Sequence, residues 1–287
     1  MKMPRLEIVA AAVMSLAGLA AAQPRLELSV GIGNCVSSWK DVSYSHAYTP
    51  PFLYDSTAVT SGLQTLTLGV DSIFGGSLSA AVIAGHFGVM VTYLAFNPDI
   101  FGTSSADAVS VRYTAMQPPD YTPTPAALDF STKMADPNGE LRETTISLDG
   151  IFRVALPGWF SLDLSAGLTW FNIEGEIGVL DYWKFWLGGH SVLFAQQYQL
   201  LMDIESFNRI GGNAGATLNW HMATNASLWI EARYYLAGSG QADLSFEPVE
   251  SESVIVAFDP ETDIIPVGDL VIKPSFFRFA AGFRIVF

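Results

Sequence analysis

Seven charged side chains interrupt segments of the chain that otherwise alternate between apolar and small polar residues. Each falls on the polar phase of its segment, where serine, threonine or glycine would otherwise stand. Charges in a confined space of low dielectric must pair, because each unpaired ion costs several kcal/mol. Arginine suits such pairing, since its planar guanidinium binds a carboxylate through two hydrogen bonds. We therefore expect an internal ion network, either a gate or selectivity filter or a permanent plug, at Asp149, Arg153, Asp163, Glu231, Arg233, Arg278 and Arg284.

A second group of residues suited to binding is aromatic. Four such residues fall within five consecutive positions, Tyr182, Trp183, Phe185 and Trp186, and an apolar run from 192 to 202 follows them. An exposed patch of this kind normally marks a binding surface or a membrane contact. We expect these side chains either to line an apolar ligand pocket or to extend a membrane-facing or loop-packing surface.

Three acidic residues, Asp259, Glu261 and Asp263, alternate near the C-terminal end of the chain. They are candidate ligands for a hard divalent cation, which prefers carboxylate oxygens; a solvated acidic surface explains the same spacing. Acidic residues outnumber basic ones 28 to 14, and the excess lies between the alternating segments. Such a surface would gather divalent cations diffusely, and it argues against a nucleic-acid partner, which basic residues would have to hold.

The sequence gives catalysis little support. The histidines are His46, His86, His190 and His221, and no spacing pairs one of them with a serine nucleophile. Catalytic triads are defined by geometry rather than by sequence position. The chain carries no phosphate-binding loop, no CxxC pair and no HExxH motif. We expect neither a catalytic residue nor a cofactor; a lipid-modifying enzyme or a protease is the alternative.

The elements that must position these residues are strands. Between residues 159 and 171 every second position is apolar, and residues 226–236 repeat the pattern. A helix would place apolar side chains three and four positions apart, so period two predicts strands. Half of the 287 residues are hydrophobic and 15% are charged, which excludes a disordered chain. The lone Cys35 excludes a disulfide scaffold.

Residues 1–22 have the features of a secretory signal peptide. A basic start and an apolar run precede Ala20, Ala21 and Ala22, the small residues that signal peptidase requires. The apolar run is shorter than the roughly 20 residues that span a bilayer, which argues against a membrane anchor. We therefore expect a single mature domain over 23–287.

The final segment places apolar and aromatic residues on one face up to the last residue: Phe277, Phe279, Ala281, Phe283, Ile285 and Phe287. This pattern resembles the C-terminal assembly signal of Gram-negative outer-membrane β-barrels, and the chain as a whole resembles the small OmpA-like and OmpW-like barrels. A strand in lipid must pair both of its edges, which requires a closed ring. The resemblance implies an all-β, closed antiparallel transmembrane barrel with short periplasmic turns and long extracellular loops.

The same resemblance implies a location in the outer membrane of a diderm bacterium. The role would be surface structure and interaction, or passage of small solutes through a narrow lumen. The expected partners are outer-membrane lipid, lipopolysaccharide and the barrel-assembly machinery.

Eight strands are predicted, at 24–36, 63–73, 77–96, 144–155, 159–172, 207–221, 226–237 and 274–287. Tight turns are predicted at 74–76, 156–158 and 223–225, and long loops at 37–62, 97–143, 173–206 and 238–273. Aromatic residues near the strand ends are expected to form girdles at the two membrane interfaces: Trp159, Trp170, Trp220, Trp229, Tyr234, Tyr235 and Phe276.

Three alternatives to this plan stay open. Residues 77–96 are long and uncharged enough for a transmembrane helix. Alternation within 107–116 and 242–258 indicates either hairpins that prolong the barrel or a count of ten or twelve strands. A secreted soluble β-sandwich would use the same aromatic residues as an ordinary core.

Overall fold

The computed structural model describes residues 23–39, 42–48, 56–59, 62–106, 109–117, 122–134, 136–187, 191–242, 244–251 and 270–287. Within these ranges the regular structure is β, in seventeen strands. No helix among them has the length and apolar character needed to cross a bilayer. The predicted signal peptide lies outside the described residues.

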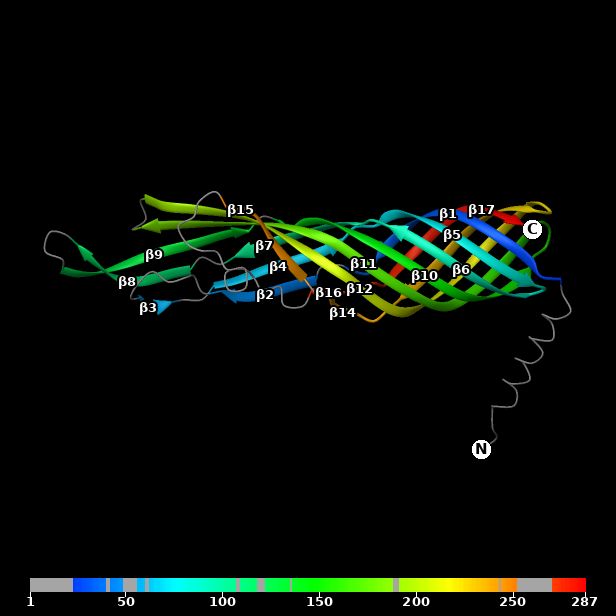
Figure 1. The fold of residues 1–287 in the computed structure, drawn as a ribbon, viewed down its shortest axis with the longest axis horizontal. Coiled ribbons are helices and arrows are strands. Elements are labelled where there is room, and N and C mark those ends of the chain that lie inside the picture. Colours follow the sequence, from blue (N-terminus) through cyan, green and yellow to red (C-terminus); the bar gives the residue numbers. More distant parts are fainter. Residues whose placement is uncertain are drawn as a thin grey trace, which may run out of the picture.

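Eight of the strands close into an antiparallel ring (Figure 1). Strand β1 pairs with β17, with Ser29 opposite Arg284, so the two ends of the described chain form one seam of the wall. The pairing of β10 with β11 completes the ring. Its members are β1 (Arg25–Ser37), β5 (Ile73–Ala84), β6 (Phe87–Phe96), β10 (Asn138–Ala155), β11 (Phe160–Leu187), β12 (Ser191–Ala223), β13 (Ala226–Leu236) and β17 (Phe276–Val286). The predicted fold class and strand number are confirmed, and a sandwich is excluded.

One of the predicted strands is in fact a hairpin. The segment 77–96 belongs to β5 and β6, which pair antiparallel around a turn at Gly85 and His86. Gly85 has φ of 63°, a conformation that glycine adopts without strain. The change of phase at this point therefore marks a turn and neither a bulge nor a helix. The tight turn predicted at 74–76 is wrong, because those residues lie within β5.

The other predicted turns hold, since short connections join β10 to β11 at 156–159 and β12 to β13 at 224–225. These turns lie with the start of β1 and the C-terminus at one end of the barrel, on the right of Figure 1. We call this the short-turn end.

The long connections at the opposite end continue the wall as a stem. Strands β4 and β7 follow on from β10, while β9 pairs with the distal part of β11 and β15 with that of β12. The predicted strand 63–73 is β4, a stem strand outside the ring. The stem consists of the distal parts of β11 and β12 with β2 (Val42–Tyr48), β3 (Ser56–Val59), β4 (Gly62–Val70), β7 (Asp99–Ala106), β8 (Val109–Gln117), β9 (Thr122–Met134) and β15 (Leu244–Ser251). A separate pair is formed by β14 (Gly240–Ala242) and β16 (Leu270–Ile272). The described parts of the alternating stretches 107–116 and 242–258 thus lie in added strands outside the ring.

Side chains alternate strictly between the two faces of the wall. Outward positions of the ring are exposed and apolar, as at Ile32, Leu168 and Ile230, while inward positions are buried. Trp159, Trp170, Trp220 and Tyr234 face outward, as predicted for interfacial aromatics. Trp229, Tyr235 and Phe276 are buried on the inward phase instead, so their assignment to a girdle is wrong.

Trp229 determines how closely three strands approach one another. Its indole lies against Gly31 of β1 and Gly282 of β17, where a Cβ would come within 2.3 and 2.4 Å of the ring. A Cβ on Gly282 would also lie 2.1 Å from the carbonyl oxygen of Val30, whereas the nearest backbone atom to a Cβ on Gly31 is 3.2 Å away. Only glycine fits either position with this ring in place.

We predict that Gly31→Ala destabilises the barrel by about 1–3 kcal/mol, the usual effect of overpacking. Trp229→Leu in the same chain should remove most of this effect, because the clash is with the indole. Gly282→Ala is the matched control, which Trp229→Leu should not rescue, since its clash includes the Val30 carbonyl. Urea unfolding in phospholipid vesicles measures all five variants; equal rescue of both alanine variants would contradict the packing described here.

Candidate functional site in the barrel interior

The charged residues nearest the short-turn end form a group of four, which we call the lower tetrad: Glu27, Arg153, Asp163 and Arg284. Arg153 donates from Nε to Asp163 Oδ1 at 2.6 Å and from Nη2 to Asp163 Oδ2 at 2.8 Å. It also donates to both carboxylate oxygens of Glu27, at 2.6 and 2.9 Å. Arg284 Nη1 lies 2.9 Å from Asp163 and 3.1 Å from Glu27. The group links β10 and β11 to the seam between β1 and β17.

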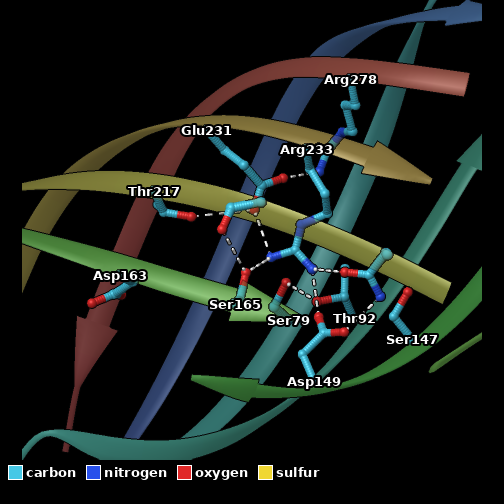
Figure 2. A network of polar contacts seen from close by, with 12 residues as sticks. Ser79, Thr92, Ser147, Asp149, Asp163, Ser165, Thr217, Glu231, Arg233 and Arg278 are labelled. Atoms are coloured by element: carbon cyan, nitrogen blue, oxygen red, sulfur yellow. Dashed lines mark hydrogen bonds and ion pairs between the residues drawn. The ribbon is translucent and has the colours of Figure 1, made fainter. Parts of the chain in front are cut away.

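A second group of four, the upper tetrad, lies further towards the stem: Asp149, Glu231, Arg233 and Arg278 (Figure 2). Arg233 pairs with Asp149 and, at 3.0 Å, with Glu231. Glu231 in turn accepts from Arg278 Nη1 at 3.0 Å. Arg278 then donates to Ser77 Oγ on β5 at 2.6 Å.

Uncharged polar side chains complete this network. Asn213 donates to Asp149 at 2.6 Å and to Thr169 at 2.9 Å, while its own oxygen accepts from Arg233 at 2.9 Å. Arg233 also donates to Ser165 at 2.9 Å. The upper tetrad and its polar partners thereby connect six of the eight ring strands across the lumen.

Each tetrad holds two arginines and two carboxylates, so each is formally neutral. All seven contacts between unlike charges lie within 3.1 Å, and every participating side chain is at most 16% exposed. Neutrality and hydrogen bonding are the conditions under which charges can be buried without a prohibitive desolvation penalty. Arginine's fork geometry is used most fully at Arg153, which binds two carboxylates in bidentate fashion.

An apolar layer crosses the lumen immediately above the upper tetrad. It forms around Phe276, which stacks on Tyr235 with ring centroids 4.5 Å apart and meets Phe96 edge-on at 5.0 Å. Phe171 packs on Phe276 from the opposite wall at 6.4 Å. Cys35 and Leu94 are buried in the same layer.

The interior leaves these side chains without contact with water. Arg233 and Arg278 are each 1% exposed, and Phe171 is 0% exposed. A side chain that lined an open aqueous channel would retain an accessible surface. At the levels of the upper tetrad and the apolar layer, the described residues therefore leave no passage as wide as a water molecule.

The structure brings together all seven residues proposed for the internal ion network, in two groups. Glu27 was not among them, although its alternation with Leu26 and Leu28 places it on the lumen phase of β1. Asn213 and Ser165 were also missed, because uncharged polar residues on a lumen face carry no distinguishing pattern. Arg153 and Arg284 make no ion pair with the upper tetrad in the described part of the chain.

The aromatic candidates lie on the distal part of β11, where Tyr182 is opposite Gln197 of β12 and Lys133 of β9. The side chains of Tyr182, Trp183, Phe185 and Trp186 lie outside what the structure describes. The candidate metal ligands Asp259, Glu261 and Asp263 fall outside the described residues altogether.

Two of the histidines have described side chains, both near the short-turn end. His86 lies in the β5–β6 turn. The prediction of a single strand over 77–96 placed it in the middle of the membrane, and that position is wrong. Its Nδ1 donates to the Arg153 carbonyl oxygen at 2.8 Å. His221 shares a hydrogen bond of 2.9 Å with Ser161, which also accepts from Asn219. We find no acidic side chain hydrogen-bonded to either ring among the described residues.

A closed antiparallel ring of eight strands, with an apolar outer wall and paired charges inside, defines the chain as an eight-stranded β-barrel of the outer-membrane type. No protein-family model matches the chain, and no curated protein matches it in sequence.

Three solved structures show what the fold is similar to. The outer membrane protein OprG from Pseudomonas aeruginosa has 10% identity and a TM-score of 0.43, over 93% of this chain and 97% of that one. Neisserial surface protein A has 13% identity and a TM-score of 0.36, over 92% and 98%. Ail, the attachment invasion locus protein of Yersinia pestis, solved with a heparin analogue, has 12% identity and a TM-score of 0.32, over 91% and 99%.

We predict that Asp163→Asn lowers the free energy of unfolding by about 3–5 kcal/mol, because it leaves two buried arginines with one countercharge between them. Urea unfolding of the barrel in phospholipid vesicles measures this change. Asp71→Asn is the matched control, since Asp71 is exposed and lies outside the ring strands. An equal midpoint for the two variants would show that the lower tetrad does not stabilise the barrel.

Proposed function

We propose that this protein is an outer-membrane barrel with a closed lumen, and that it carries a β-stem outside the cell for surface interaction. The observation that supports this most directly is the burial of the upper tetrad and the apolar layer across the full lumen. An interior filled in this way suits a rigid base better than a conduit. Passage of solutes is the alternative, and it would require both levels to rearrange.

The outer wall supports a location in a membrane. Ile32, Leu168 and Ile210 expose 63%, 66% and 75% of their surface, and further apolar side chains surround them on every ring strand. Soluble monomers rarely expose a continuous apolar surface of more than a few hundred Å². Such an apolar wall is stable in contact with lipid hydrocarbon. In a closed ring every strand edge is paired, so no backbone hydrogen-bonding group of the wall is left without a partner in lipid.

The two ends of the barrel indicate its orientation. Short turns and both ends of the ring lie on one side, whereas the stem lies on the other. Bacterial barrels keep short turns in the periplasm and long connections outside. The stem therefore faces the extracellular medium, and the C-terminal strand is presented to the periplasmic barrel-assembly machinery.

Acidic side chains lie on the outer face where the wall leaves its apolar band. Glu140 is directly opposite Glu176, which is directly opposite Asp203, across β10, β11 and β12. These residues line a hollow of about 420 Å³. Like charges on facing strand positions repel, and divalent cations shared with lipopolysaccharide phosphates would relieve the repulsion. No cluster able to hold a metal ion on its own occurs among the described residues, so this binding is diffuse.

We propose no catalytic role for the barrel. The hydrogen-bonded pair of Ser161 and His221 is explained as part of the lumen's polar packing, because Ser161 is buried and its hydroxyl oxygen also accepts a hydrogen bond from Asn219. Turnover of lipid or peptide that is lost with His221→Gln would favour the enzyme alternative.

The closed lumen predicts that the protein, reconstituted in planar lipid bilayers, gives no discrete conductance steps. Phe171→Ala should likewise give no conductance steps, because the upper tetrad still fills the lumen beneath the apolar layer. Insertion must be verified separately, by protection of the ring strands from protease added to vesicles. Conductance steps from the native chain would overturn the closed-barrel proposal.

The orientation predicts which connections are accessible on intact cells. An epitope inserted between Leu187 and Ser191 should bind antibody without permeabilisation, since it lies at the distal end of β11 and β12. The control insertion, between Thr224 and Asn225, should bind only after the outer membrane is opened. The reverse pattern would place the stem in the periplasm and contradict the proposal.

A further inference from the structure

The apolar outer wall of the barrel carries a groove of about 730 Å³ over β1, β17, β13 and β12, with Phe160 of β11 at its edge. Its centre is Ala281, whose outward methyl lies between Ile32 of β1 and Ile230 of β13 in the strand register. Along β17 the next outward residue is Phe283, which also lines the groove. A small side chain among larger ones leaves the wall indented at this point.

The residues packed inside the barrel keep the wall thin beneath the groove. Gly31 and Gly282 form part of the floor of the groove, and both must be glycine because the Trp229 indole occupies the space inside them. Backbone and the buried ring therefore form the floor of the hollow, and outward side chains such as Ile32 and Phe283 form its sides.

The chemistry of the lining restricts the occupant to hydrocarbon. The side chains that line the groove are hydrocarbon apart from the indole nitrogens of Trp220 and Trp229, and that of Trp229 is buried. Ile32 and Ile230 are 63% and 58% exposed and belong to the apolar wall that the proposed membrane covers, so the groove is continuous with that wall. A peptide segment would bring backbone amides for which the groove offers no partner, and an unsatisfied amide is costly in such surroundings.

The position of the groove indicates the leaflet. Trp220 and Phe160 line its end nearest the short turns, where Phe160 begins β11 and Trp220 lies three residues before the end of β12. Aromatic side chains favour the boundary between hydrocarbon and headgroups. A lipid seated here would place its headgroup beside Trp220 and run its chain towards Ala281.

We propose that this groove is a binding site for one acyl chain of a phospholipid from the periplasmic leaflet. The site rests on the proposed membrane location, and it differs from the general lipid contact of the wall because one chain is held in a preformed hollow. A second copy of the protein is the less suitable occupant, since stable protein interfaces combine a flat packed core with a hydrogen-bonding rim, which this lining lacks.

Native mass spectrometry of the full chain, released from detergent micelles that contain palmitoyl-oleoyl phosphatidylethanolamine, tests the proposal. We expect one lipid retained per chain, and equal retention of the phosphatidylglycerol with the same acyl chains, because the groove recognises hydrocarbon. Ala281→Trp should reduce the retained fraction at least tenfold by filling the hollow. Ala80→Trp is the matched control, at an exposed outward alanine on β5 that does not line the groove, and it should retain lipid normally.

Resistance to unfolding by dodecyl sulfate before heating confirms that each variant is folded, and Ala281→Leu replaces Ala281→Trp if the larger residue prevents folding. No retained lipid in the native chain, or equal loss in the variants at Ala281 and Ala80, would overturn the site. A dimer that disappears with Ala281→Trp would replace lipid with a second copy. A chain that stays soluble without detergent would instead refute the membrane location itself.

Discussion

Two arginines and two carboxylates must lie together in each of the two charged groups that cross the lumen of this barrel. A ring of eight strands encloses a space just wide enough for side chains, so a guanidinium that points inward cannot reach bulk water and must be neutralised by acids from other strands. The lower and upper tetrads satisfy this requirement twice. Because their members come from β1, β10, β11, β13 and β17, electrostatic neutrality is reached only when distant parts of the chain have assembled.

The interior changes in character along the barrel axis. Charged groups fill the half nearest the short turns, and the rings around Phe276 fill the level above them. The outer wall is uniformly apolar over the same length. Rigidity thus has two sources, directional ion pairs in one half and close aromatic packing in the other, and both act against deformation of a ring that already has every strand edge paired.

Alternation in the sequence was sufficient to predict the ring and the inward phase of Asp149, Asp163 and Arg233, because a period of two fixes the face of a strand whatever its neighbours are. The predicted number of eight strands is right because two errors in the assignment cancel. Alternation was not sufficient for register between strands. The eight predicted strands include one, β4, that belongs to the stem, and one that is the β5–β6 hairpin. The hairpin was missed because Gly85 and His86 interrupt an uncharged run without the proline or asparagine that usually marks a turn.

Which inward residues meet across the lumen could not be read from the sequence either. The pairing of Arg153 with Glu27 joins residues 126 positions apart and depends on the stagger of the whole ring. Trp229, Tyr235 and Phe276 are a different case, because each shares its strand phase with an inward charged residue, Glu231, Arg233 or Arg278, so the alternation already indicated that they are buried.

Strand β12 runs for 33 residues without interruption, far more than the roughly ten that cross a bilayer. At about 3.3 Å per residue its 33 residues extend over about 110 Å. Because β12 pairs with β11 over almost its whole length, the hairpin is a stiff extension and not a flexible linker. A partner bound at the distal end of this hairpin would therefore be held at a fixed distance from the barrel, without the dilution that a flexible linker imposes on a tethered group.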